Sequence, residues 1–388
     1  MNIFKNLVIM TTLVCLAANN GLAEEAHQHE THDAHAHDAH DAQPSEGELP
    51  EISAFIDIQA LRTDADDNPN NEKLRIREVE VGIGGNLNPS VRADLIIALE
   101  QEYASDDSVE SAVHVEEAYV SFLELPGGFE AQVGRTLIGF GTLNAIHPHH
   151  WAFADTPLAL ENLFGDHPWF DDGATISGLV PNPMDIIIGL SVGGRNGNEI
   201  DHGHAHEDEH EEDGHEEGDH DDDEDHEESD VIEWEGKLFT GRAFTDLPLT
   251  DRLNLQAGYS VILDEGNNLL QGTDIIFEYF WPQSHRRVTW HTERFAFDAD
   301  DGESDPSGLF SAVQVTADEH WEFGGRYDRT ELLADDTQDA WAGTGFVTYY
   351  LTHTTYVRGQ YQFKEHGDGE EENIVTAQLV WGIGPHAH

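Results

Sequence analysis

The stretch Val375-Thr-Ala-Gln-Leu-Val-Trp-Gly-Ile383 decides the fold, because apolar residues alternate along it with small or polar ones. In an extended chain Leu379 and Trp381 lie on one face and Gln378 on the other. Residues 54–60, near the other end of the chain, show the same period of two. Segments of about ten residues with this alternation are typical of transmembrane barrel strands.

Sixteen segments of the chain fit this pattern, and single-chain bacterial barrels have an even number of strands. We therefore predict an all-β fold, a transmembrane antiparallel β-barrel of about 16 strands. A soluble β-sandwich in the periplasm is the alternative, since it also shows alternation and turns. The predicted strands are residues 51–63, 74–86, 90–103, 112–124, 129–136, 173–180, 185–195, 232–244, 252–263, 272–281, 287–299, 307–317, 320–331, 338–350, 354–366 and 373–383.

The connections between the predicted strands alternate between short and long. Short connections such as 87–89 and 125–128 contain Pro or Gly-Gly, which is turn chemistry. The connections at 137–172 and 196–231 are much longer. Outer-membrane barrels have short periplasmic turns and longer external loops, whereas a sandwich has no need of this asymmetry. The alternation favours a barrel over residues 51–388, in the outer membrane, with both termini in the periplasm.

The N-terminus carries an export signal. Lys5 precedes an apolar stretch, and Gly21-Leu-Ala23 supplies small residues at a cleavage site, so we predict a signal peptide over residues 1–23. Cys15 lies within it, and the mature chain then holds no cysteine, which excludes disulfides and thiolate metal sites. Residues 24–50 are polar and His-rich, and we expect a disordered periplasmic tail there.

Composition excludes several classes of function. Asp and Glu number 78 against 18 Lys and Arg, giving a formal charge of −60. Such a surface repels the phosphate backbone of nucleic acids and attracts cations. After the signal peptide no apolar run reaches the ~18 residues that a transmembrane helix needs. No nucleophile-elbow, zincin or phosphate-loop motif is present, so we predict that the protein is not an enzyme.

Two His-rich tracts predict metal binding. Residues 196–230 hold 19 Asp or Glu and seven His, and the tail has similar chemistry. Imidazole and carboxylate ligands suit Zn, and also Cu, Ni or Co, so zinc is the predicted ion with the others as alternatives. A solvated acidic loop and a disordered spacer are the competing interpretations of the two tracts. The predicted ligands are His27, His29, His32, His35, His37, His40, His202, His204, His206, His210, His215, His220 and His226.

The connection after the fifth predicted strand combines aromatic residues with histidines. Its landmarks are Val133-Gly-Arg135, His147-Pro-His149, Asp155-Thr-Pro157-Leu158, Phe164-Gly165 and Asp171-Asp172-Gly173. These residues resemble a porin-like family of outer-membrane β-barrels with His-rich loops, often described as zinc-regulated proteins or zinc-uptake receptors. The specific match covers residues 133–173, and the general barrel match covers residues 51–383.

The resemblance implies that the third external loop, residues 137–172, folds toward the pore and narrows it. It also implies a metal-linked role in the outer membrane, and porins are often homotrimers. The alternative is that Trp151, Phe153, Phe164 and Trp169 pack this loop on the wall and its histidines only donate hydrogen bonds. The predicted constriction residues are His147, His149, His150, Asp155, Asp166, His167 and Arg135.

Together these features predict a porin-like outer-membrane channel for the capture or uptake of a divalent metal, with zinc first. The alternative is a barrel that binds or buffers metal without selective transport. Expected partners are metal ions, outer-membrane lipid and the outer-membrane assembly machinery. That machinery commonly reads an aromatic final residue, and here Trp381 is followed by residues 382–388.

Overall fold

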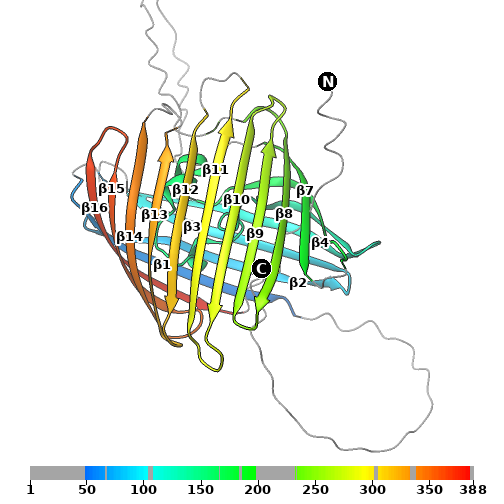
Figure 1. The fold of residues 1–388 in the computed structure, drawn as a ribbon, viewed down its shortest axis with the longest axis horizontal. Helices are drawn as coiled ribbons and strands as arrows, with labels where there is room; N and C mark the ends of the chain where they lie inside the picture. The colour runs from blue at the N-terminus through cyan, green and yellow to red at the C-terminus, as the bar shows by residue number, and fades with distance from the viewer. Residues whose placement is uncertain are drawn as a thin grey trace, which may run out of the picture.

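Sixteen antiparallel strands close into one barrel in the computed structural model (Figure 1). The structure describes residues 49–65, 68–103, 108–165, 167–182, 186–197, 232, 234–300, 305–332 and 338–384. Each strand pairs with its neighbours in sequence, and β1 closes the ring on β16. The strands are β1 (Glu51–Thr63), β2 (Lys73–Asn88), β3 (Val91–Tyr103), β4 (Val109–Leu125), β5 (Phe129–Leu137), β6 (Phe170–Leu179), β7 (Ile187–Arg195), β8 (Leu238–Thr250), β9 (Leu253–Leu263), β10 (Leu269–Phe280), β11 (Arg287–Asp298), β12 (Ser307–Thr316), β13 (Trp321–Glu331), β14 (Asp339–Tyr350), β15 (Tyr356–Glu365) and β16 (Glu371–Ile383).

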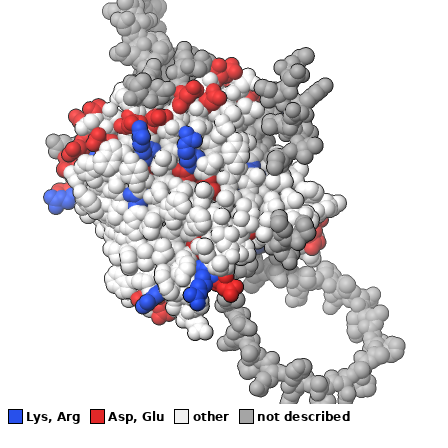
Figure 2. All heavy atoms as spheres, in the orientation of Figure 1, with Lys and Arg blue, Asp and Glu red and all other residues white. Residues whose placement is uncertain are grey.

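The two faces of the wall follow the alternation in sequence. On β15 the side chains of Val357 and Tyr361 are exposed on the outside, while Arg358, Gln360 and Gln362 are buried inside. On the face seen in Figure 2, most charged side chains gather toward the two ends, and a broad uncharged band lies between them. An apolar outer band is what a membrane-spanning barrel requires. No helix in the described part of the chain has the length and apolarity to cross a membrane.

The connections confirm the predicted alternation. One end carries short turns, such as the two residues between β2 and β3, and the other carries the long connections after β5 and β7. We call these the turn end and the loop end. In the turn before β13, the Asp318 carboxylate accepts hydrogen bonds from the backbone N–H groups of His320 and Trp321, which lower the pKa of Asp318.

The predicted strand count is confirmed, but strands β4, β6, β8 and β10 have bounds that differ from the prediction by three or more residues. Strand β8 covers Leu238–Thr250 and not the predicted 232–244. It contains Pro248, which lies at an irregularity of the β8–β9 pairing, a position where a strand tolerates proline. Strand β6 begins at Phe170, so residues 170–172 belong to the wall, and the loop after β5 covers residues 138–169.

The loop 138–169 lies inside the barrel and supplies most of its core. It contains a 3-10 turn at Pro148–His150 and the helix α1, Leu158–Phe164, seen behind the front strands in Figure 1. Aromatic side chains of the loop pack on apolar side chains that β8–β14 turn inward. This buried cluster includes Phe140, Trp151, Phe153, Phe164 and Trp169 from the loop and Leu238, Ile262, Leu270, Phe295, Phe310 and Phe346 from the wall.

Candidate metal centre

Two β-bulges bring extra charged side chains into the lumen. Along β4, Ile96 of β3 pairs with Glu117 and Ile97 pairs with Val115, so Glu116 is an additional residue without a partner in the register. Because a bulge shifts the alternation by one, Glu116 and Glu117 both point inward and are buried. On β2 the register shifts in the same way around Arg77, and Arg77 and Glu78 are both buried.

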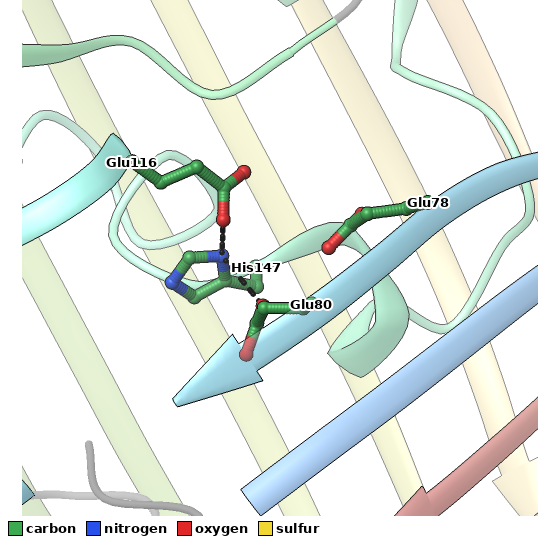
Figure 3. Close-up of side chains that lie close together, drawn as sticks. All are labelled: Glu78, Glu80, Glu116 and His147. Carbon is green, nitrogen blue, oxygen red and sulfur yellow. Dashed lines mark ion pairs between the residues drawn. The ribbon is translucent and has the colours of Figure 1, made fainter. Parts of the chain in front are cut away.

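His147 lies at the centre of the carboxylates that these strands present. Its Nδ1 atom is 3.2 Å from Glu80 Oε2 on β2 and 3.4 Å from Glu116 Oε2 on β4. Its Nε2 atom is 3.0 Å from Glu117 Oε1. Figure 3 shows Glu80 and Glu116 pointing at the imidazole from two different strands. The ring of His147 is 1% exposed, so these contacts are sheltered from bulk solvent.

His149 extends the cluster toward β1. Its Nδ1 atom is 3.6 Å from Glu80 Oε2 and 3.7 Å from Glu78 Oε1, and its ring stacks on Phe55 with centroids 4.2 Å apart. The Oε1 atom of Glu78 is buried and makes no hydrogen bond among the described residues. A buried carboxylate oxygen without a hydrogen bond is costly, and a bound cation would relieve that cost.

Ligand atoms from Glu78, Glu80, Glu116 and His147 all lie within 4.8 Å of one another. Four ligands in a tetrahedron around zinc stand about 3.3 Å apart, given bonds of about 2 Å. Side-chain adjustments of about 1 Å would therefore close this group around one ion. A His nitrogen with carboxylate oxygens is a ligand set that zinc accepts.

A second group lies beside the first and shares a residue with it. Glu100, His114 and Glu116 also offer ligand atoms within 4.8 Å of one another. His114 Nε2 is 3.7 Å from Glu100 Oε2, and the loop residue His167 places Nδ1 3.2 Å from Glu100 Oε1. Glu100 belongs to β3, which runs between the strands that carry Glu80 and Glu116.

The charge at this part of the wall favours a cation. Glu78, Glu80, Glu100, Glu116 and Glu117 are all buried there. The buried guanidinium of Arg77 is 3.5 Å from Asp57, so a further carboxylate competes for its charge. Like charges held close together in a sheltered site repel strongly unless protons or cations compensate them. A divalent ion would supply that compensation at the centre of the group.

The wall also holds residues 149–154 through hydrogen bonds to their backbone. Arg358 donates to the carbonyls of Trp151 and Phe153 at 2.7 and 2.9 Å, and Tyr356 donates to the carbonyl of His149 at 2.8 Å. The Ala154 carbonyl accepts hydrogen bonds from Gln59 at 2.9 Å and Arg77 at 3.3 Å. These bonds fix the path of residues 149–154 and therefore the placement of the two buried histidines.

The structure does not bring all of the predicted constriction residues together in one site. Asp155 forms an ion pair with Arg326 at 2.7 Å and accepts hydrogen bonds from the side chains of Gln360 and Gln362. These contacts anchor the loop to β13 and β15. Arg135 pairs with Asp172 on the adjacent strand β6, at 3.0 Å, which is a contact within the wall. His150 is exposed and belongs to neither ligand group.

Several predicted ligands lie outside the described residues. These are Asp166, the tail histidines His27, His29, His32, His35, His37 and His40, and the loop histidines His202, His204, His206, His210, His215, His220 and His226. Their assignment as metal ligands remains a prediction.

The residues Glu78, Glu80, Glu100, His114 and Glu116 were not predicted as ligands. For Glu78 and Glu116 the signal in the sequence is a break in the alternation. Arg77-Glu78 and Glu116-Glu117 each place two charged residues side by side on a strand, where one of them would otherwise face lipid. A bulge that turns both inward is the physical resolution of that conflict.

Comparisons with known proteins support the fold. No family model matches the chain. OprB of Pseudomonas putida superposes with a TM-score of 0.55 at 8% identity, covering 87% of this chain and 94% of that chain. OmpF of Salmonella typhi, in a complex with daunomycin, superposes with a TM-score of 0.55 at 10% identity, covering 88% of this chain and 99% of that chain. An anion-selective porin from Comamonas acidovorans superposes with a TM-score of 0.53 at 13% identity, covering 86% of this chain and 99% of that chain.

One relative by sequence is an uncharacterized protein of Aquifex aeolicus, which is 30% identical over 158 residues. The alignment covers 37% of this chain and 33% of that protein, so the chain spans about a third of the length of this relative. The structural likeness establishes the fold, a porin-type β-barrel, and leaves the function to be argued from the site.

Proposed function

We propose that this protein is an outer-membrane channel that captures divalent metal ions and passes them through its lumen, with zinc as the preferred cargo. The observation that carries the proposal is the group of Glu78, Glu80, Glu116 and His147, whose ligand atoms lie within 4.8 Å of one another inside a porin-type barrel. Carboxylates buried this close together repel one another, and a divalent cation between them would compensate that repulsion.

The sequence between β7 and β8 supports the same function. The His- and acid-rich segment 196–230 connects β7 and β8 at the loop end. Fixed negative charge at a channel mouth raises the local concentration of cations. Weak sites in that segment would capture ions, and the buried group would select those that accept nitrogen as well as oxygen. Nickel, copper and cobalt share this ligand preference and are the competing cargoes.

A second candidate function is metal binding without transport. The loop 138–169 contacts both sides of the lumen, because its aromatic residues pack on β8–β14 while His147 contacts β2 and β4. A loop held on both sides narrows the path of an ion and favours storage or sensing over passage. Homotrimer formation and interaction with the assembly machinery stay predictions under either function.

Recordings from planar bilayers separate the two functions. The purified protein should give cation-selective currents that micromolar zinc modulates, and zinc should enter proteoliposomes loaded with a fluorescent zinc indicator. The variant His147→Ala should reduce zinc entry, while His285→Ala, at the exposed turn before β11, serves as the control. Absence of both conductance and zinc entry in folded protein would overturn transport and leave the binding function.

A further inference from the structure

Two ligand groups meet at one residue of the barrel wall. One group contains Glu78, Glu80 and His147, the other contains Glu100 and His114, and Glu116 belongs to both. We propose that this cluster holds two divalent cations at once, on either side of Glu116, whose carboxylate bridges them. The inference rests on the proposed function, because it names how many ions the candidate site takes.

Each position has its own nitrogen and its own carboxylates. The first position takes His147 from the loop with Glu78 and Glu80 from β2. The second takes His114 from β4 with Glu100 from β3, and His167 is within 3.2 Å of that same glutamate. Two separate mixed ligand sets are more than one ion can use, since zinc in proteins is most often four-coordinate.

The shared residue has the chemistry that bridging requires. An ionised carboxylate has two oxygens and no proton to donate, so each oxygen can accept one cation. Glu116 is the additional residue of the β4 bulge, and its Oε2 atom faces His147 at 3.4 Å. Removal of the bulge would leave a single carboxylate, Glu117, pointing inward at this level of β4.

Two adjacent ion positions would also speed the release of an ion, which is slow from a single buried site in a channel. A site that binds an ion firmly enough to select it releases that ion slowly. Conduction requires binding that is favourable on entry and still weak enough, or divided among enough sites, for the ion to leave. Two dications that share one carboxylate repel each other, so arrival of the second would promote departure of the first.

Anomalous X-ray scattering at the zinc edge, from crystals of the full chain soaked in zinc chloride, tests the inference. We expect two peaks, one on each side of the Glu116 carboxylate. His147→Ala should remove the first peak alone, and His114→Ala should remove the second alone. Glu116→Gln, which is similar in size, should weaken both, and His285→Ala should leave both unchanged. Ions bound at the His-rich tracts would give peaks elsewhere.

The outcomes separate this inference from the proposed function. A single peak in the wild-type lumen together with zinc entry into liposomes would overturn the two-ion cluster and leave transport standing. Two peaks that persist undiminished in Glu116→Gln would overturn the bridging role. No peak in the lumen and no zinc entry would overturn both proposals. Heat-modifiable migration on gels confirms that each variant still forms the barrel.

Discussion

At the scale of single residues, the interior of this barrel is organised by charges that are buried in pairs or groups. Arg326 contacts Asp155 on the loop and Asp328 on its own strand, each at 2.7 Å, and its guanidinium stacks on Phe153. The side chains of Arg326 and Asp328 are both 0% exposed. Such groups are expensive to separate, because removal of one partner leaves the other charge buried without compensation.

Replacement of this arginine should therefore destabilise the protein strongly. For Arg326→Ala we expect a loss of about 3–5 kcal/mol in the free energy of unfolding, the range for breaking a buried ion pair. Arg329→Ala is the matched control, because its pair with Asp339 is about half exposed on both sides, so its removal should cost far less than that of Arg326. Urea unfolding in lipid vesicles measures both. Equal losses would contradict the buried-pair interpretation.

Gly141 is a second residue whose identity the structure requires. Its φ angle is +63°, and a Cβ atom there would lie 2.0 Å from Glu293 Oε2. The carboxylate of Glu293 also accepts hydrogen bonds from the backbone N–H groups of Thr142 and Leu143, at 2.9 and 3.0 Å. A side chain at position 141 would therefore displace the acceptor that holds this part of the loop.

We expect Gly141→Ala to loosen the loop 138–169, at a cost of about 1–3 kcal/mol for the strained backbone alone. Gly139→Ala is the control, since a Cβ atom there would meet nothing within 4 Å. Limited proteolysis of the folded barrel reports the difference as faster cleavage within residues 138–169. Equal cleavage rates for the two variants would show that Glu293 accommodates the added methyl group.

At the scale of elements, the β4 bulge decides which carboxylates enter the lumen. Without Glu116, the order of faces along the strand would be His114 inward, Val115 outward and Glu117 inward, which is a regular alternation. Deletion of Glu116 is therefore compatible with a regular strand. Deletion of Ala118 also removes the extra residue, but it leaves Glu117 facing the lipid.

The two deletions should therefore differ in assembly. We expect the chain without Glu116 to fold with near wild-type yield, and the chain without Ala118 to fold poorly, because a charged side chain facing lipid is costly. The fraction of heat-modifiable protein on gels after refolding measures the yield. Similar yields for both deletions would show that the strand re-forms a bulge elsewhere.

The strands and the loop 138–169 differ in how far the sequence predicts them. Alternation of period two depends on each strand alone, so the sixteen strands and the inward side of residues such as Gln378 could be predicted. The contact of His147 with Glu80 depends on how a loop crosses the lumen. That path is set by hydrogen bonds such as the one from Arg358 to Trp151, between residues far apart in the chain, and no local pattern encodes it.

At the scale of the whole molecule, the dominant property is a formal charge of −60. Charge of one sign around a pore attracts counter-ions over about one Debye length, which is about 10 Å at 0.1 M salt and about 3 Å at 1 M. The attraction of this charge for permeating cations should therefore depend strongly on ionic strength.

We expect the reconstituted channel to prefer cations over anions at 0.1 M potassium chloride, and to lose most of that preference at 1 M. Reversal potentials measured across a tenfold salt gradient, at low and at high mean concentration, give the comparison. A cation preference that stays constant with salt would assign selectivity to the buried groups around His147 and not to the field of the surface.

The hydrogen bonds that hold residues 149–154 have a consequence for redesign. Arg358, Tyr356, Gln59 and Arg77 all bind carbonyl oxygens there, which every amino acid possesses. The route of the segment therefore depends on its backbone as well as on the side chains of Trp151 and Phe153, which pack in the core. Because the Tyr356 bond is made to the carbonyl of His149, a different metal-binding side chain at position 149 would keep that bond. Position 149 is therefore a place where the metal preference of the barrel could be redesigned.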